Sequence, residues 1–226
     1  MPEGMDIIDA GGVNCYLLEA GDGFVLIDTG FPAKRMFLDE ALKKALNKPG
    51  EAPKKLKLVI LTHGDSDHAG NCRFLRENYG ASIAVHPADS GMVENGDMSW
   101  NRKPKPDKIS FTFRLAKLAF GKNSVFDTFK PDMYLRDGQD LAGFGLSAKV
   151  IHLPGHSKGS IGVLTDEGGL FCGDLVYNFA GFSYIDDLED FNESMDKLEK
   201  LDIHTLYPGH GKPFSISHLH KKVNRK

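Results

Sequence analysis

The stretch LKLVILTHGDSDH, residues 56–68, joins an apolar run to a dense cluster of histidines and aspartates. Leu56–Leu61 has the composition of a buried β-strand, and a polar loop follows it. Four potential metal ligands lie within six residues of that loop: His63, Asp65, Asp67 and His68. Open α/β sheets bind ligands at the carboxyl ends of their strands, and imidazole with carboxylate is a ligand set for first-row transition metals. The stretch therefore predicts a metal site; the alternative is an exposed loop whose side chains cap the next helix.

Three further segments repeat this arrangement of an apolar strand, a glycine turn and a single histidine or aspartate. They are Leu153-Pro154-Gly155-His156, Phe171-Cys172-Gly173-Asp174 and Tyr207-Pro208-Gly209-His210. Four strand ends that each present a histidine or aspartate would be an unusual coincidence in a purely structural protein. Together they favour a functional metal site.

The surrounding segments predict an α/β protein. A β-hairpin is expected over Val13–Gly30, helices over 34–47 and 69–78, and a strand over Ser82–His86. Further strands are expected at 146–153, 160–164, 169–172 and 205–207, with a helix near 188–201 and a frayed polar tail from His218. The two halves have similar content, which indicates a sandwich with helices outside.

Length and composition indicate one globular domain over residues 1–226. The fractions of hydrophobic (41%), charged (26%) and aromatic (10%) residues exclude collagen-like, disordered and coiled-coil classes. A formal net charge of −3 lacks the basic excess of a dedicated nucleic-acid binder. A chain of this length buries enough core to fold without a stabilising metal, so a metal site here calls for a functional reason.

The cysteines and the N-terminus predict a cytoplasmic protein. Cys15, Cys72 and Cys172 are widely spaced and odd in number, so no disulfide framework is expected. The first residues lack the basic and apolar regions of a signal peptide, and no apolar stretch approaches the ~20 residues that span a bilayer. We therefore expect no membrane partner.

Residues 90–133 interrupt the regular pattern with aromatic and methionine residues among lysines and arginines. This segment is expected to be an insertion that forms a lid or pocket wall over the metal site and receives an apolar substrate. The alternative is a pair of helices that pack on each other or on a second subunit, which would make the protein a homodimer.

With these motifs the sequence resembles the metallo-β-lactamase-fold superfamily of metal-dependent hydrolases. The matching motifs keep the family order over nearly the whole chain: LIDTG at 26–30, THGDSDHAGN at 62–71, PGHSKGSIG at 154–162, FCGDLV at 171–176 and PGHG at 208–211. The resemblance implies an αββα sandwich, in which helices flank two mixed β-sheets and the metal site lies at one edge between them.

The resemblance also implies a role for each motif residue. His63 and His156 would bind a first metal, Asp67, His68 and His210 a second, and Asp174 would bridge the two. Asp28 would support the loops from behind the ligands. The cofactors would be two divalent ions, zinc being the first candidate and manganese or iron the alternatives.

One position departs from the family pattern, because Asp65 stands where most of these hydrolases have a histidine. Either Asp65 also binds the first metal, or that metal keeps only His63, His156 and Asp174. If it binds, three carboxylates and one hydroxide surround two cations, which favours oxygen-preferring metals over zinc. If it does not, the first metal is held loosely.

The expected mechanism follows from the charges. A metal-bound hydroxide would attack a carbonyl or phosphoryl centre, with Asp67 orienting it and carrying a proton to the leaving group. Tyr177, three residues beyond Asp174, would stabilise the oxyanion, and similar lactonases of the family often carry a tyrosine at that place. The alternative is that its ring packs under the loop.

The function expected is thus a metal-dependent hydrolase of a small ester, lactone, thioester or phosphoester, with a small-molecule substrate as its partner. Asp65 is similar to the carboxylate, a glutamate, that the flavodiiron proteins of the family carry at this place. A diiron oxidoreductase is therefore an alternative. A nuclease is a weaker candidate, and a non-catalytic metal-binding protein is the remaining one. The other histidines, among them His86, His152 and His204, are expected to be structural or solvated.

Overall fold

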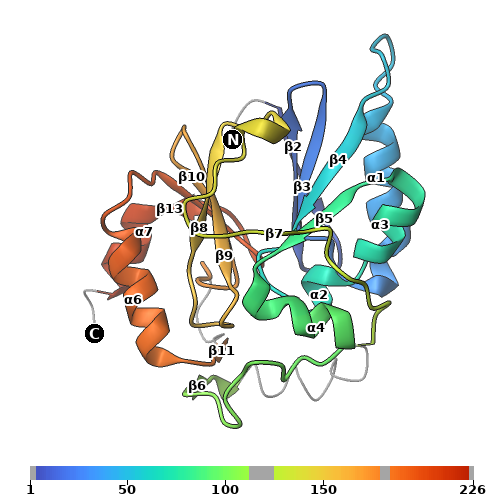
Figure 1. Ribbon diagram of the computed structural model, residues 1–226. Coiled ribbons are helices and arrows are strands. Elements are labelled where there is room, and N and C mark those ends of the chain that lie inside the picture. Colours follow the sequence, from blue (N-terminus) through green and yellow to red (C-terminus); the bar gives the residue numbers. More distant parts are fainter. Residues whose placement is uncertain (1–3, 112–124, 179–183, 224–226) are drawn as a thin grey trace.

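Two β-sheets lie face to face in the computed structural model, and helices cover the outer face of each (Figure 1). The structure describes residues 4–111, 125–178 and 184–223. This arrangement confirms the αββα sandwich that the sequence predicts. Within the described part of the chain, no helix is both long and apolar enough to cross a membrane.

The first sheet has six strands in the order β1-β2-β3-β4-β5-β7. Their bounds are Met5–Asp9 (β1), Asn14–Ala20 (β2), Gly23–Ile27 (β3), Lys55–Ile60 (β4), Ser82–Val85 (β5) and Met133–Tyr134 (β7). Strands β2 and β3 form the expected antiparallel hairpin, and β3, β4, β5 and β7 run parallel. Parallel pairing brings the carboxyl ends of β3 and β4 to the same edge of the sheet.

The second sheet has five strands in the order β13-β12-β10-β9-β8. Their bounds are Ala148–His152 (β8), Ile161–Thr165 (β9), Gly169–Gly173 (β10), Thr205–Pro208 (β12) and Phe214–Ser215 (β13). Only β10 and β12 are parallel, so this sheet is mixed. A backbone hydrogen bond from Ile161 N to Thr62 O, 2.8 Å, joins the start of β9 in this sheet to the segment that follows β4 in the first sheet.

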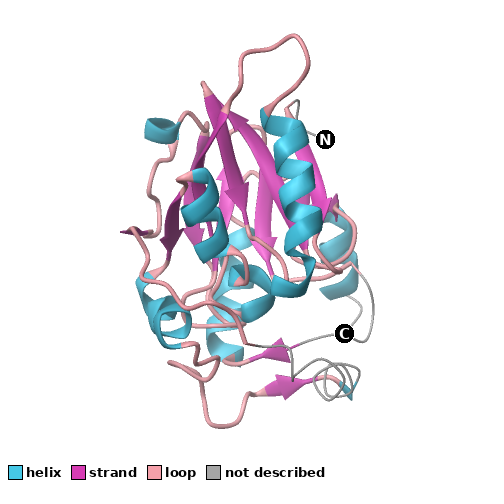
Figure 2. Ribbon diagram, turned by 90° about the vertical axis from the view of Figure 1, so that its right-hand side faces the viewer, coloured by secondary structure: helices cyan, strands magenta, loops and turns pink. Residues whose placement is uncertain are grey.

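Helices α1 (Arg35–Leu46) and α3 (Cys72–Tyr79) cover the outer face of the first sheet, which faces the viewer in Figure 2. The buried residues Leu38, Leu42 and Leu46 recur every four positions along α1, so one stripe of the helix packs on the sheet. Helices α6 (Leu188–Leu198) and α7 (Ile216–Val223) cover the second sheet. Shorter pieces are η1 (Pro32–Lys34), α2 (Ser66–Ala69), η2 (Pro87–Asp89), α4 (Ser90–Asn95) and η4 (Ala142–Phe144).

Helix α7 corrects the prediction of a frayed tail from His218. Leu219 is buried and Ile216 packs beside it in the cluster under the second sheet. These two apolar residues lie three positions apart, which places them on one helical face. That short apolar contact orders a segment whose composition is mainly polar and basic.

The core between the sheets is built from both inner faces. Leu58 and Ile60 of β4 meet Val150, Val163 and Phe171 of the second sheet, while Val59 and Leu61 pack toward the outer helices. Strand β4 is therefore apolar on both faces, as a central parallel strand requires. Its burial fixes the position at which the chain emerges into Thr62 and His63.

The segment 90–133 is only partly described, because residues 112–124 lie outside the described residues. Strand β6 (Lys108–Ile109) pairs with β11 (Tyr184–Ile185) in a small separate ribbon. Phe126 and Phe129 are buried in the core under the first sheet, so this end of the segment is part of the domain's core. The lid or pocket wall stays a prediction for the rest.

Candidate metal centre

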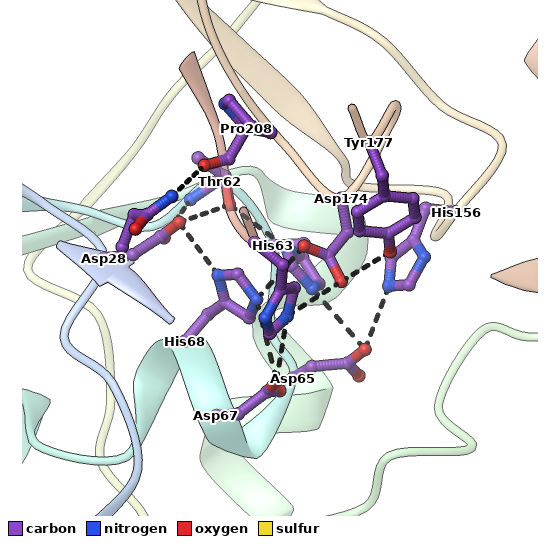
Figure 3. A network of polar contacts seen from close by, with 12 residues as sticks. Asp28, Thr62, His63, Asp65, Asp67, His68, His156, Asp174, Tyr177 and Pro208 are labelled. Carbon is purple, nitrogen blue, oxygen red and sulfur yellow. Dashed lines mark hydrogen bonds and ion pairs between the residues drawn. The ribbon is translucent and has the colours of Figure 1, made fainter. Parts of the chain in front are cut away.

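The seven predicted ligands come together at one edge of the sandwich (Figure 3). Two groups can be separated by geometry. The first group is His63, Asp65 and His156, and the second group is Asp67, His68 and His210; in each, the ligand atoms lie within 4.8 Å of one another. Asp174 lies close to His63 and His68, within the same limit. They lie in the segments that follow four strands, β4, β8, β10 and β12, with Asp67 and His68 in the short helix α2.

Two glycines allow these loops to meet. Gly173 has φ 51°, in the left-handed region, and a Cβ there would lie 2.5 Å from Thr62 Oγ1. A Cβ on Gly209 would lie 2.4 Å from Asp174 Oδ1 and 2.6 Å from His68 Cε1. The glycine turns noted in the sequence thus leave the space into which the ligands converge.

Asp65 is the centre of the first group. Its Oδ2 lies 3.0 Å from His156 Nε2 and 3.4 Å from His63 Nε2. The aspartate at the unusual position is thus aimed at the same point as both histidines. The structure brings Asp65 together with the other predicted ligands, although its role as a metal ligand stays a prediction.

Asp174 lies between the second group and the first. Its Oδ1 is 3.4 Å from His68 Nε2 and its Oδ2 is 3.5 Å from His210 Nε2. Asp67 Oδ2 lies 3.4 Å from His210 Nε2 and 3.8 Å from His68 Nε2. Burial lowers the pKa of His210, but Asp174 and Asp67 outweigh it and raise that pKa to about 10. The carboxylates of Asp174 and Asp67 therefore favour a positive charge beside them.

Each histidine is oriented by a partner at its Nδ1 atom. His68 Nδ1 faces Asp28 Oδ2 at 2.9 Å, His210 Nδ1 faces Gly12 O at 2.7 Å and His156 Nδ1 faces Tyr184 O at 3.2 Å. His63 Nδ1 lies 3.0 Å from Thr62 Oγ1, whose own proton goes to Asp28 Oδ2. When Nδ1 donates to these acceptors, the Nε2 lone pairs point into the cluster, which is the arrangement a metal-binding histidine needs.

The residues present fit a pair of divalent cations. His63 Nε2, His68 Nε2 and Asp174 Oδ1 are buried and have no hydrogen-bond partner among the described residues. Buried polar atoms are otherwise almost always paired, because an unpaired one costs about 1–3 kcal/mol. Three such atoms that face one another, with imidazole and carboxylate donors around them, match the chemistry of a two-metal site.

Asp28 holds the second group from behind, as the resemblance implies. It is buried with φ 60°, and it accepts hydrogen bonds from Thr62 N at 2.8 Å and Thr62 Oγ1 at 2.8 Å besides its contact with His68. Aspartate and asparagine tolerate this left-handed backbone better than most residues. One side chain thus fixes both the loop after β4 and a ligand.

Sequence reasoning missed a second buried aspartate, Asp89. Its Oδ2 accepts from Gly64 N at 3.0 Å and Ser157 Oγ at 2.7 Å, and its Oδ1 accepts from Gly159 N at 2.7 Å. It therefore joins the two loops that carry the histidines of the first group. The signal was available, because Asp89 follows β5 as the ligands follow their strands.

Sequence reasoning also missed Arg102, and no pattern singles it out. Its Nη2 lies 3.0 Å from each carboxylate oxygen of Asp65, and its side chain is 9% exposed. Its guanidinium lies over the Tyr184 ring, 5.1 Å from the centroid. The Asp65 pKa is held well below its usual range, because Arg102, His156 and His63 outweigh the effect of burial.

Tyr177 reaches the cluster with its hydroxyl. The half-buried side chain donates a hydrogen bond to Asp174 Oδ2 at 2.9 Å. Burial, then the charge of Asp174, raises its pKa well above the usual value, so the hydroxyl keeps its proton. The hydroxyl is thus a donor at the edge of the site, and its role at the oxyanion stays a prediction.

The remaining histidines and cysteines that the sequence set aside lie outside the cluster. His86 and His152 stack on each other, with ring centroids 4.2 Å apart. His204 is exposed on the surface, and Cys15, Cys72 and Cys172 are free and buried. These placements agree with the structural and solvated roles expected.

Comparison with known proteins connects this geometry to a family. The family model described as the metallo-beta-lactamase superfamily matches residues 8–210. A beta-lactamase-like protein 2 homolog of Caenorhabditis elegans is 27% identical over 88% of this chain, which spans only 56% of that relative. The chicken acyl-coenzyme A thioesterase MBLAC2 is 25% identical, over 92% of this chain and 76% of its own.

Solved structures agree on the fold. A metallo-beta-lactamase family protein from Thermus thermophilus superposes with a TM-score of 0.72 at 24% identity, covering 99% of this chain and 79% of the other. TTHA1623 in a di-iron-bound form superposes with a TM-score of 0.64 at 27% identity, covering 96% of both chains.

Proposed function

Because the chain belongs to the metallo-beta-lactamase superfamily, we propose that it is a two-metal hydrolase that cleaves a small thioester or ester. The observation that carries the proposal is the convergence of buried, unpaired Nε2 and carboxylate atoms on one point of the cluster. Lactone and phosphoester substrates remain within the same chemistry. The name of the chicken thioesterase relative supports a thioester first.

Two divalent cations, once bound, polarise the substrate's carbonyl oxygen and lower the pKa of water to roughly 7. His63, Asp65 and His156 would hold the first cation, and Asp67, His68 and His210 the second, with Asp174 shared. Zinc, manganese and iron all suit imidazole with carboxylate; the third carboxylate, Asp65, shifts the preference toward manganese or iron.

The side chains of the cluster supply the remaining steps. Asp67 takes up the proton of the attacking water and returns it to the leaving sulfur or oxygen, because its carboxylate points into the cluster beside His68 Nε2 and His210 Nε2. Tyr177 turns its hydroxyl proton from Asp174 Oδ2 to the oxyanion that forms at the carbonyl oxygen when the carbonyl carbon is attacked. Asp28 and Asp89 keep the loops in place while these charges change.

Elemental analysis with a substrate screen tests the proposal. We expect two divalent ions per chain after purification without added metal or chelator. We also expect turnover of an acyl thioester or p-nitrophenyl ester that a chelator abolishes and added metal restores. A protein that binds two ions yet cleaves no thioester, ester, lactone or phosphodiester would contradict the proposed activity.

Tyr177→Phe tests the oxyanion role. We expect kcat to fall about 10- to 100-fold with KM nearly unchanged, because the hydroxyl acts when the oxyanion forms. Tyr134→Phe is the matched control, since the Tyr134 hydroxyl donates to Glu94 on the surface. Equal kcat in the two variants would remove Tyr177 from the mechanism.

A diiron oxidoreductase is the second candidate, supported by the Asp65 carboxylate and by the di-iron form of TTHA1623. Two iron ions per chain, visible absorbance and dioxygen consumption with a reductant would favour it. A colourless, oxygen-inert protein would exclude it.

A further inference from the structure

The two metal-binding groups differ in one respect that the proposed function does not use. Asp65 of the first group pairs with the guanidinium of Arg102, 3.0 Å from both carboxylate oxygens. Among residues 4–111, 125–178 and 184–223, Asp67 and Asp174 form ion pairs only with histidines. Arginine thus lies against the carboxylate of the first group alone.

Arg102 is fixed in this position by its surroundings. Its guanidinium packs over the Tyr184 ring, and Tyr184 O also faces His156 Nδ1 of the first group. The next residue, Lys103, donates its backbone N–H to Asp186 Oδ2 at 3.2 Å. Arg102 is therefore part of the wall of the site and does not sample solvent as a surface arginine would.

The charges explain why an arginine is placed there. Asp65 adds one negative charge to those of Asp67 and Asp174, and the permanently protonated guanidinium adds one positive charge. The pair of Asp65 and Arg102 carries the same net charge as the neutral histidine that similar hydrolases have at position 65. Any cation that binds Asp65 Oδ2 has to share that carboxylate with a guanidinium in hydrogen-bonding contact, and like charges this close repel strongly.

We propose that Arg102 tunes the first group by competing with its metal for Asp65, so that the first group binds divalent cations more weakly than the second. Arg102 is a positioning residue, since it acts through Asp65. The first cation is then the exchangeable one, and its occupancy follows the free metal concentration. This inference rests on the proposed two-metal site.

Arg102→Gln is the variant that tests the inference, because glutamine keeps a hydrogen-bond donor and removes the charge. The metal-free protein is titrated with Mn²⁺ or Zn²⁺ alone against a competing chelator, which gives two dissociation constants. We expect Arg102→Gln to raise the affinity of the weaker step about 10- to 100-fold and to leave the tighter step unchanged. A purely structural role for Arg102 predicts the opposite sign, since loss of a supporting contact weakens metal binding about 10- to 100-fold.

Three controls sharpen the test. Arg102→Lys keeps the positive charge, so its weaker step should stay within about threefold of the wild type. Arg73→Met removes an exposed arginine paired with Glu77 and should change neither step. In a His156→Ala background, which removes one of the three ligands of the first group, Arg102→Gln should leave the tighter step unchanged.

The outcomes separate this inference from the proposed function. Two cations bound by the wild type, with no gain or a loss of affinity in Arg102→Gln, would overturn the role of Arg102 alone. No cation bound by the wild type would overturn both. If circular dichroism shows that Arg102→Gln does not fold, the comparison is made with Arg102→Met, for which the expected sign is the same.

Discussion

The first and second metal-binding groups lie side by side but are held in different ways. In the second group, Asp28 contacts a ligand directly at His68 Nδ1 and also fixes the loop after β4. In the first group, Asp89 contacts no ligand and holds the backbone of two loops at Gly64 and Gly159. A buried aspartate thus touches a histidine only in the second group, whereas His63 and His156 of the first group are held at Nδ1 by Thr62 Oγ1 and Tyr184 O.

The first group is the half of the centre in which the ligands have room to vary. A histidine whose far nitrogen faces a carboxylate keeps its orientation and gains basicity, so His68 makes the second group the firmer anchor. The first group has an aspartate where a histidine is usual, and Arg102 lies against it. Variation in metal preference is therefore expected to arise in the first group.

Asp174→Ala gives the largest effect, because Asp174 lies close to His63 of the first group and to His68 of the second. We expect loss of both metal ions and a fall in turnover on the order of a thousandfold or more, with the fold retained by the large core. Elemental analysis, an activity assay and far-ultraviolet circular dichroism measure these three outcomes. Loss of helical signal in parallel with loss of metal would mean that the ions are structural.

Asp28→Asn is expected to weaken the second group more than the first, because Asp28 contacts His68 directly and His63 only through Thr62 Oγ1. Asparagine tolerates φ 60°, but its amide has one acceptor oxygen, so it cannot accept from Thr62 N on one side and from Thr62 Oγ1 and His68 Nδ1 on the other as the carboxylate does. We expect the free energy of unfolding to fall by about 2 kcal/mol and the affinity of the tighter metal step to fall about 10- to 100-fold. Urea unfolding and chelator titration measure both.

Asp22→Asn is the matched control for Asp28→Asn, because Asp22 lies on the exposed turn between β2 and β3. It should change the free energy of unfolding by less than about 0.5 kcal/mol. An equal loss of affinity in both metal steps of Asp28→Asn would contradict the separation of the two groups.

Asp89→Asn should affect the first group with a smaller change in metal affinity. Its carboxylate accepts two backbone N–H groups and the Ser157 hydroxyl, so the two loops would separate slightly while the ligands themselves keep their partners. We expect a loss of about 1–2 kcal/mol in unfolding free energy and a fall of about tenfold or less in the weaker metal step. A change confined to the tighter step would show that Asp89 supports the second group and not the first.

Much of this centre could be predicted from the sequence, because its signals are local. Each ligand follows an apolar strand within a glycine turn, and a central strand such as β4 specifies the edge at which the chain emerges. The hairpin, the helices and the two-sheet sandwich follow from apolar periodicity in the same way. These features need no knowledge of distant contacts.

The supporting residues could not be predicted in that way, because they act across the fold. Arg102 meets Asp65 only once the loop after α4 has packed against Tyr184 of β11, 82 positions further along the chain. Asn14 and Tyr16 likewise hold the His210 loop through Pro208 O, at 3.0 and 2.6 Å. Helix α7 was missed for a related reason: a single buried Leu219 outweighs its polar composition.

Lowering the pH is expected to change the free energy of unfolding least. This change tests the support that the first group receives through His86 and Asp89. His86 lies between β5 and Asp89, stacks on His152 and accepts from Ala88 N through Nδ1 at 3.3 Å. Burial, and next the neighbouring His152, lower its pKa to about 4, whereas the unfolded chain has about 6.5. Between these values the unfolded state binds more protons, so the free energy of unfolding falls as pH falls from about 6.5 to 4.

His86→Asn isolates this contribution, because asparagine keeps an acceptor for Ala88 N and does not titrate. The ring is half-exposed, so solvent screening limits the contribution to about 1 kcal/mol. Asp89, Asp137 and Arg136 also influence the ring and stay unchanged in the variant. Urea unfolding at pH 7 and pH 4.5 should therefore show a loss that is smaller in His86→Asn by about 1 kcal/mol. Equal losses in the two proteins would mean that His86 binds a proton as readily in the folded protein as in the unfolded chain. The support of the first group through Asp89 would then not depend on a neutral His86.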